Sequence, residues 1–130
     1  MIIVLDSNEY IDYFNSKNSL DRLFSNQDLA VYINDVVIRE VIRNLKEPQI
    51  KEFYNIIFSK NIDFYGDKLS SALLEKFKKL GLKKGDIVIA AFCEAIEADY
   101  LITENRHFLK KRKFEMFKVA SLRGFLGKLK

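Results

Sequence analysis

The sequence predicts an α/β protein, a three-layer α/β/α sandwich with a central, mainly parallel five-stranded sheet. Two observations lead to this prediction. Short apolar runs of strand length recur along the 130 residues, and segments with the apolar spacing of helices separate them. Strands that alternate with helices form parallel sheets, because a parallel pair needs a long crossover connection. The length and the lack of a Pro/Gly-rich linker in the sequence predict one domain over residues 1–130.

Five segments are expected to form the strands. Residues 1–5 (MIIVL) are apolar throughout, which is typical of a strand buried on both faces of a parallel sheet. Residues 29–33 (LAVYI) and 100–103 (YLIT) have the same character. Residues 61–65 (NIDFY) and 117–120 (FKVA) show weaker patterns and complete the predicted sheet.

The segments between these runs have helical patterns. Asn34 is a preferred N-cap residue, and apolar residues at 38, 41, 42 and 45 fall on one face of the helix that follows it. Pro48 is expected to separate two helices, and Gly81 to end another as its C-cap. The helices are expected over residues 7–15, 19–25, 34–45, 49–59, 68–80 and 85–97, with a short helix after the fourth strand.

The composition excludes several classes of protein. Hydrophobic residues make up 48% of the chain and charged residues 31%, which is typical of a globular protein and not of a disordered one. No apolar run approaches the ~20 residues of a membrane-spanning helix, and the start MIIVLDSN lacks the features of a signal peptide. The one cysteine, Cys93, is expected to be a buried small apolar residue. We therefore expect a cytoplasmic protein that does not bind a membrane.

Acidic and polar residues fall at one edge of the predicted sheet. Asp6 follows the first strand, Glu40 lies in the second turn of the helix after the second strand, and Asp86 opens the helix that leads into the fourth. Three polar residues follow the fourth strand: Thr103, Glu104 and Asn105. The carboxyl ends of parallel strands share one edge, where binding sites collect. Asp99 precedes the fourth strand, so we expect it at the opposite edge.

Each of these carboxylates also has a structural interpretation. Residues 6–9 (DSNE) match a capping box, in which Asp6 binds the first amides of a helix and Glu9 reaches back. Asp86 can cap its helix or interact with the helix dipole. Glu40 can pair with a neighbouring arginine on the solvent face.

Three carboxylates that lie close together repel one another, and a hard divalent cation removes that cost. A small set of oxygen ligands suits Mg²⁺ or Mn²⁺, with water and a substrate phosphate completing the shell. Such a cation lowers the pKa of a bound water, orients a phosphate and stabilises charge in the transition state. The expected chemistry is therefore hydrolysis of a phosphodiester bond.

Four blocks of the sequence resemble the PIN domain family, and in size and organisation the chain looks like the VapC-type toxin ribonucleases. The blocks are IIVLDSN (2–8), VVIREVIRNL (36–45), KKGDIVIAAFCEAIEADYLITENRHF (83–108) and FKVAS (117–121). The third block is the most specific, because an acid that opens an Ala-rich helix is followed by ADYLIT and a closing HF. The resemblance implies a three-layer α/β/α domain and a metal-dependent ribonuclease.

The resemblance also implies roles for single residues. Asp6 and Asp86 would be direct Mg²⁺ ligands, and Glu40 would complete the metal shell or orient the attacking water. The family often has a fourth acid where this chain has Asn105, which would hold a metal-bound water or the substrate, so one or two metal ions remain possible. The residues that would support this centre are Ser7 or Asn8, Thr103 and Glu104.

The positive charge is concentrated near the C-terminus. Between Thr103 and Lys130 the chain has nine Lys/Arg residues and two acids, within a total net charge of +4. A solvated helix end is one interpretation, and contact with the phosphates of RNA is the other. The residues expected to follow an RNA backbone are Arg106, Lys110, Lys111, Arg112 and Lys113.

The resemblance thus predicts a Mg²⁺-dependent endoribonuclease that is the toxin of a type II toxin–antitoxin pair. It would act on RNA, be inhibited by a small antitoxin protein and form a homodimer. Two alternatives stay open. One is an RNA-binding or processing module with weak or no turnover, suggested by Asn105, and the other is a DNA nuclease on a related scaffold.

Overall fold

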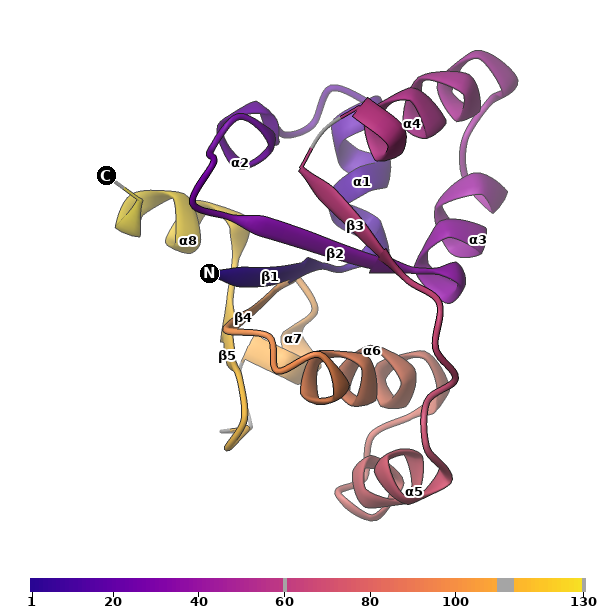
Figure 1. Cartoon of the computed structure of the whole chain (residues 1–130), viewed down its shortest axis with the longest axis vertical. Helices are drawn as coiled ribbons and strands as arrows, with labels where there is room; N and C mark the ends of the chain where they lie inside the picture. The colour runs from indigo at the N-terminus through magenta and orange to yellow at the C-terminus, as the bar shows by residue number, and fades with distance from the viewer. Residues whose placement is uncertain (60, 110–113, 130) are drawn as a thin grey trace.

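The computed structural model describes residues 1–59, 61–109 and 114–129. These residues form a five-stranded sheet in which every neighbouring pair of strands is parallel (Figure 1). The strands lie in the order β3-β2-β1-β4-β5. Their bounds are β1 Ile2–Leu5, β2 Ala30–Asn34, β3 Ile62–Tyr65, β4 Tyr100–Ile102 and β5 Lys118–Ala120. All five predicted strands are confirmed, with shifts of at most one residue at either end.

Eight helices are found within the described residues. Their bounds are α1 Ser7–Phe14, α2 Asp21–Phe24, α3 Asp35–Arg43, α4 Glu47–Ser59, α5 Ser71–Lys79, α6 Lys84–Ala95, α7 Arg106–Leu109 and α8 Leu122–Lys128. The ends of the first six lie within three residues of their predicted ranges, and α7 is the short helix predicted after the fourth strand. The sequence interpretation missed α8, whose seven residues include Gly124 and Gly127, both poor helix formers. Ser121 stabilises the start of α8, because its hydroxyl oxygen accepts the Gly124 N–H at 3.0 Å.

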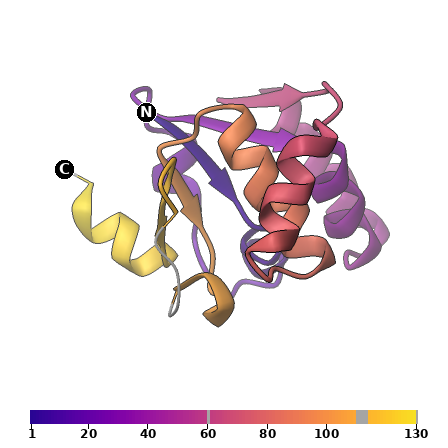
Figure 2. The ribbon, with the colours of Figure 1, turned by 90° about the horizontal axis from the view of Figure 1, so that it is seen from below.

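The helices make two layers around the sheet. Helices α1 to α4 lie on one side of it, and α5 and α6 lie on the other (Figure 1). In the view from below, α5 and α6 run side by side in front of the strands (Figure 2). This arrangement confirms the predicted three-layer α/β/α fold.

The central strand β1 marks a change of direction in the sheet. The chain adds β2 and then β3 on one side of β1, and it later adds β4 on the other side. Ile3, Val4 and Leu5 are fully buried, as expected for a strand covered on both faces. Ligands of open α/β sheets bind outside the carboxyl ends of the strands where the strand order reverses, and here that point lies between β1 and β4.

Several local signals in the sequence have their expected roles. Gly81 follows α5 with φ at 90°, a conformation that favours glycine at the end of a helix. The prediction that Pro48 separates two helices is wrong, because Pro48 lies in the first turn of α4, where its missing N–H costs little. Cys93 is fully buried in α6, and this burial raises the pKa of its thiol well above the ordinary value. Within the part of the chain that the structure describes, no helix combines the length and apolarity of a membrane span.

Candidate active site

A cavity of about 120 Å³ opens at the carboxyl edge of the sheet. Segments far apart in the sequence line it: the turn from β1 into α1, the first two turns of α3 and of α6, and the loop after β4. The lining residues are Asp6, Ser7, Asn8, Val36, Val37, Glu40, Gly85, Asp86, Val88, Ile89 and Asn105. The structure thus brings the carboxylates of Asp6, Glu40 and Asp86 to one cavity, together with the amide of Asn105.

Asp6 is held in place by two hydrogen bonds. As the N-cap of α1 it accepts the backbone N–H of Ser7 on Oδ1 at 2.8 Å. The hydroxyl of Thr103, which is fully buried at the end of β4, donates to Asp6 Oδ2 at 2.7 Å. Both bonds stabilise the ionised carboxylate, and they fix its direction toward the cavity.

Asp86 is oriented by Asn105. The side-chain amide of Asn105 donates to Asp86 Oδ1 at 3.1 Å, and its carbonyl oxygen accepts the His107 N–H at 2.9 Å. The Asn105 backbone N–H in turn donates to the Thr103 hydroxyl oxygen at 3.0 Å. Asn105 therefore presents its NH₂ group to Asp86, and its role in holding a metal-bound water or the substrate stays a prediction.

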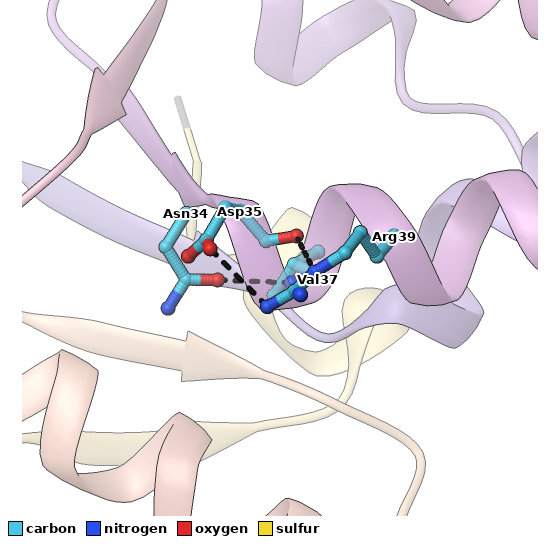
Figure 3. Close-up of polar contacts among 4 residues, drawn as sticks. All are labelled: Asn34, Asp35, Val37 and Arg39. Carbon is cyan, nitrogen blue, oxygen red and sulfur yellow. Dashed lines mark hydrogen bonds and ion pairs between the residues drawn. The ribbon is translucent and has the colours of Figure 1, made fainter.

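The start of α3 determines where Glu40 lies. Asn34 caps this helix as predicted, because its Oδ1 accepts the Val37 N–H at 2.9 Å (Figure 3). Arg39 pairs with Asp35, Nη2 to Oδ2 at 3.2 Å, in the same turn (Figure 3). The alternative interpretation, a pair between Glu40 and Arg43 or Arg39, is wrong, because neither arginine forms an ion pair with Glu40 among the described residues. Within the described residues, the carboxylate of Glu40 has no hydrogen bond or ion pair and faces the cavity.

Burial and mutual repulsion act together on these carboxylates. Burial raises the pKa of Asp6, repulsion from Glu40 and Asp86 raises it further, and the bonds from Thr103 and Ser7 oppose this effect. The pKa of Asp86 is also raised, first by burial and then by repulsion from Glu40, while His107 and Asn105 lower it. The site therefore holds more negative charge than its protein donors compensate.

This donor set fits a hard divalent cation. All the charged groups are oxygen ligands, and neither Asp86 Oδ2 nor the Glu40 carboxylate accepts a bond from the described residues. A cation would relieve the repulsion that contributes to the raised pKa values of Asp6 and Asp86. Among the described residues, however, no group of three or more His, Cys, Asp or Glu side chains lies close enough together to hold a metal ion. Mg²⁺ needs only one or two carboxylates, since it keeps several of its waters.

Glu9 departs from its sequence interpretation. The capping-box interpretation is wrong for its side chain, which is 1% exposed and forms a hydrogen bond with the carboxylate of Glu104. Burial, followed by repulsion from Glu104, raises the pKa of Glu9 to about 8. At neutral pH a protonated Glu9 therefore connects α1 to the loop after β4. No local sequence signal distinguishes this buried acid from a helix cap.

Other expected site residues lie outside the cavity lining. Glu104 accepts the Leu122 N–H on Oε2 at 3.0 Å, at the start of α8. Arg106 is exposed at the start of α7, and Asp99 accepts the Ile2 N–H at 2.7 Å at the opposite, amino edge of the sheet, as expected.

Asp86 lies three residues after Lys83, the N-cap of α6, so the capping interpretation is wrong for it. Four expected RNA contacts lie outside the described residues: Lys110, Lys111, Arg112 and Lys113.

Comparisons with known proteins agree with this geometry. The sequence profile of the PIN domain matches residues 3–114. Five chains of solved structures match, and one belongs to the crystal structure of VapBC2 from Rickettsia felis bound to a DNA fragment from its promoter. That chain is 22% identical with a TM-score of 0.64, and the match covers 93% of this chain and 98% of that one. At this identity the likeness concerns the fold. No curated protein matches the sequence.

Proposed function

The chain belongs to the PIN domain family, and from this premise we propose that it is a Mg²⁺-dependent endoribonuclease, the toxin of a type II toxin–antitoxin pair. The observation that carries the proposal is the meeting of Asp6, Glu40 and Asp86 around one cavity. Three carboxylates from distant segments, two of them with raised pKa values, are costly unless a cation compensates them. We propose Mg²⁺ as that cation, with Mn²⁺ as a substitute.

Asp6 and Asp86 would hold the cation, and Glu40 would complete its ligands or orient the attacking water. When bound, the cation would supply a water of lowered pKa and positive charge beside the reacting phosphate. The chain itself supplies orientation. Thr103 fixes Asp6 and Asn105 fixes Asp86, so both carboxylates face the cavity before the substrate arrives.

The toxin assignment is supported by the shared fold with a VapBC2 chain. The proposed inhibitor is a small antitoxin protein, and a basic side chain of that protein would neutralise the acidic cavity. We further propose that the whole chain is a single domain, that it forms a homodimer and that it acts on RNA in the cytoplasm. The dimer would use the helical side of α1 to α4, where Tyr54 and Phe58 of α4 stack with ring centroids 6.3 Å apart and are 38% and 82% exposed.

A cleavage assay on matched substrates tests the function. The purified protein is incubated with a single-stranded RNA and with a DNA of the same sequence, each with Mg²⁺ and with EDTA. Cleavage of the RNA that requires Mg²⁺ is expected. Tight binding of RNA that remains intact would instead support a binding module, and preferential cleavage of the DNA would support a DNA nuclease. Light scattering on the same sample measures whether the chain is dimeric.

A further inference from the structure

A second, larger cavity adjoins the acidic one. It has a volume of about 540 Å³ and lies between the end of α5 and the start of α6. Its lining is Lys78, Leu82, Lys83, Lys84, Gly85, Asp86 and Ile87. Gly85 and Asp86 line both cavities, so the two are neighbours at the first turn of α6.

The charged residues that line the second cavity are three lysines and Asp86, so positive charge predominates there. Residues 76–84 contain five lysines and no acid. Lys76 is paired with Glu94, Nζ to Oε1 at 2.6 Å. Lys78, Lys83 and Lys84 are exposed, and within the described residues none of them has a carboxylate within 4.0 Å. Their charge is therefore available to a ligand.

Gly85, which lines both cavities, places no side chain between them. A Cβ atom at Gly85 would meet no atom within 4 Å, so the space beside this residue is open. The N-cap residue of α6, Lys83, makes no side-chain bond to the helix start. The open space at Gly85 therefore leaves room for a ligand between the carboxylate of Asp86 and the lysines.

We propose that this lysine cavity binds the backbone phosphates of the RNA strand that lie immediately beside the bond cut at Asp86. The acidic cavity and the lysine cavity meet within one helical turn. A polyanion fits this pair, because one of its phosphates can lie at a cation held by the carboxylates while the next phosphates contact the lysine ammonium groups. The inference rests on the proposed function. It adds a binding site formed by Lys78, Lys83 and Lys84, and it gives the bound strand a defined path along the start of α6.

The test measures RNA affinity without cleavage. Fluorescence anisotropy of a labelled single-stranded RNA is recorded in EDTA over a range of salt concentrations, for the Asp6→Asn protein with and without Lys83→Gln and Lys84→Gln. Glutamine keeps the length of each side chain and removes the charge. The matched control carries Lys17→Gln and Lys51→Gln, two exposed lysines on the α1–α4 side of the sheet. Thermal unfolding verifies that all three proteins are folded.

For single strands, each lost phosphate contact reduces the salt slope by about 0.7, which corresponds to roughly fivefold in affinity at 0.1 M salt. We expect such a loss for each of the two lysines and none for the control pair. Unchanged affinity and slope in the Lys83/Lys84 variant, with a wild-type protein that cleaves RNA, would overturn the lysine site alone. A wild-type protein that neither cleaves nor binds RNA would overturn the proposed function, and this inference with it.

Discussion

The hydroxyl of Thr103 donates a 2.7 Å hydrogen bond to Asp6 Oδ2, although 97 positions separate the two residues. The bond joins the ends of β4 and β1, the two strands between which the strand order reverses. It stabilises the ionised carboxylate, opposing the burial that raises the pKa of Asp6. A buried side chain of a structural strand therefore adjusts the charge state of the proposed site.

Replacing Thr103 by valine tests this relationship. Thr103→Val keeps the shape of the side chain and removes its donor, so the pKa of Asp6 should rise further. The ionised carboxylate of Asp6 is needed to hold the cation, so the acid limb of the pH–rate profile should move to higher pH. Cleavage of RNA near neutral pH should fall about ten- to hundredfold. The Thr103→Ser variant keeps the donor and should retain most of the activity. A valine variant with the wild-type pH profile would show that the bond does not act on Asp6.

Asn105 offers a test of Asp86 as a cation ligand. The Asn105→Asp substitution replaces the amide donor with a second carboxylate beside Asp86. We expect tighter Mn²⁺ binding at pH 8, by several-fold, because the local negative charge increases. Isothermal titration calorimetry measures this change. An Asp86→Asn protein should bind Mn²⁺ much more weakly, and equal affinities in all three proteins would remove Asp86 from the metal site.

The buried acid Glu9 should make stability depend on pH. Its pKa is about 8 in the folded protein and near 4.5 in an unperturbed glutamate. Between these pH values the unfolded chain has released a proton that the folded protein keeps, so the free energy of unfolding falls as the pH rises and levels off above pH 8.

Urea unfolding of Glu9→Gln at pH 5, 6, 7 and 8 checks this dependence. The variant keeps a neutral hydrogen-bond donor, so its advantage over the wild-type protein should widen with pH, to on the order of 3 kcal/mol at pH 8. Glu75→Gln, an exposed control on α5, should follow the wild-type curve. A constant difference between Glu9→Gln and the wild-type protein would show that Glu9 is ionised throughout this range.

The cap of α3 should contribute to stability. Asn34 is 4% exposed, and its side chain accepts the Val37 N–H. Asn34→Ala should lower the free energy of unfolding by about 1 to 2 kcal/mol, measured by urea denaturation. Asn34→Ser restores an acceptor and should recover part of the loss. If serine and alanine are equally destabilising, the side-chain bond is not what stabilises this helix.

Much of the fold could be predicted because its signals are local. The continuous apolar run that became β1 and the asparagine that caps α3 each report a structure within a few residues. The acids of the site could be placed at one edge because parallel strands fix which loops meet there. The geometry of a parallel sheet was therefore enough to predict that Asp6, Glu40 and Asp86 lie at one site, although they are far apart in the sequence.

The features that escaped prediction depend on contacts that no local pattern reveals. Glu9 has the position of a capping-box residue, and only its tertiary contact with Glu104 shows that it is buried. The orientation of the Asn105 amide depends on the turn that places its carbonyl against the His107 N–H. The lysines at 78, 83 and 84 are visible in the sequence, but their position beside Asp86 requires the packing of α5 against α6.

The central claim is that Asp6, Glu40 and Asp86 would hold a divalent cation that the protein needs to cleave RNA. The most direct measurement compares RNA cleavage by the wild-type protein, Asp6→Asn and Asp99→Asn, with Mg²⁺ and with EDTA. Asp99 is a suitable control because it lies at the opposite edge of the sheet, where it binds the Ile2 N–H. We predict Mg²⁺-dependent cleavage by the wild-type and Asp99→Asn proteins and none by a folded Asp6→Asn protein. Cleavage by Asp6→Asn at the wild-type rate, or undiminished cleavage in EDTA, would contradict the claim.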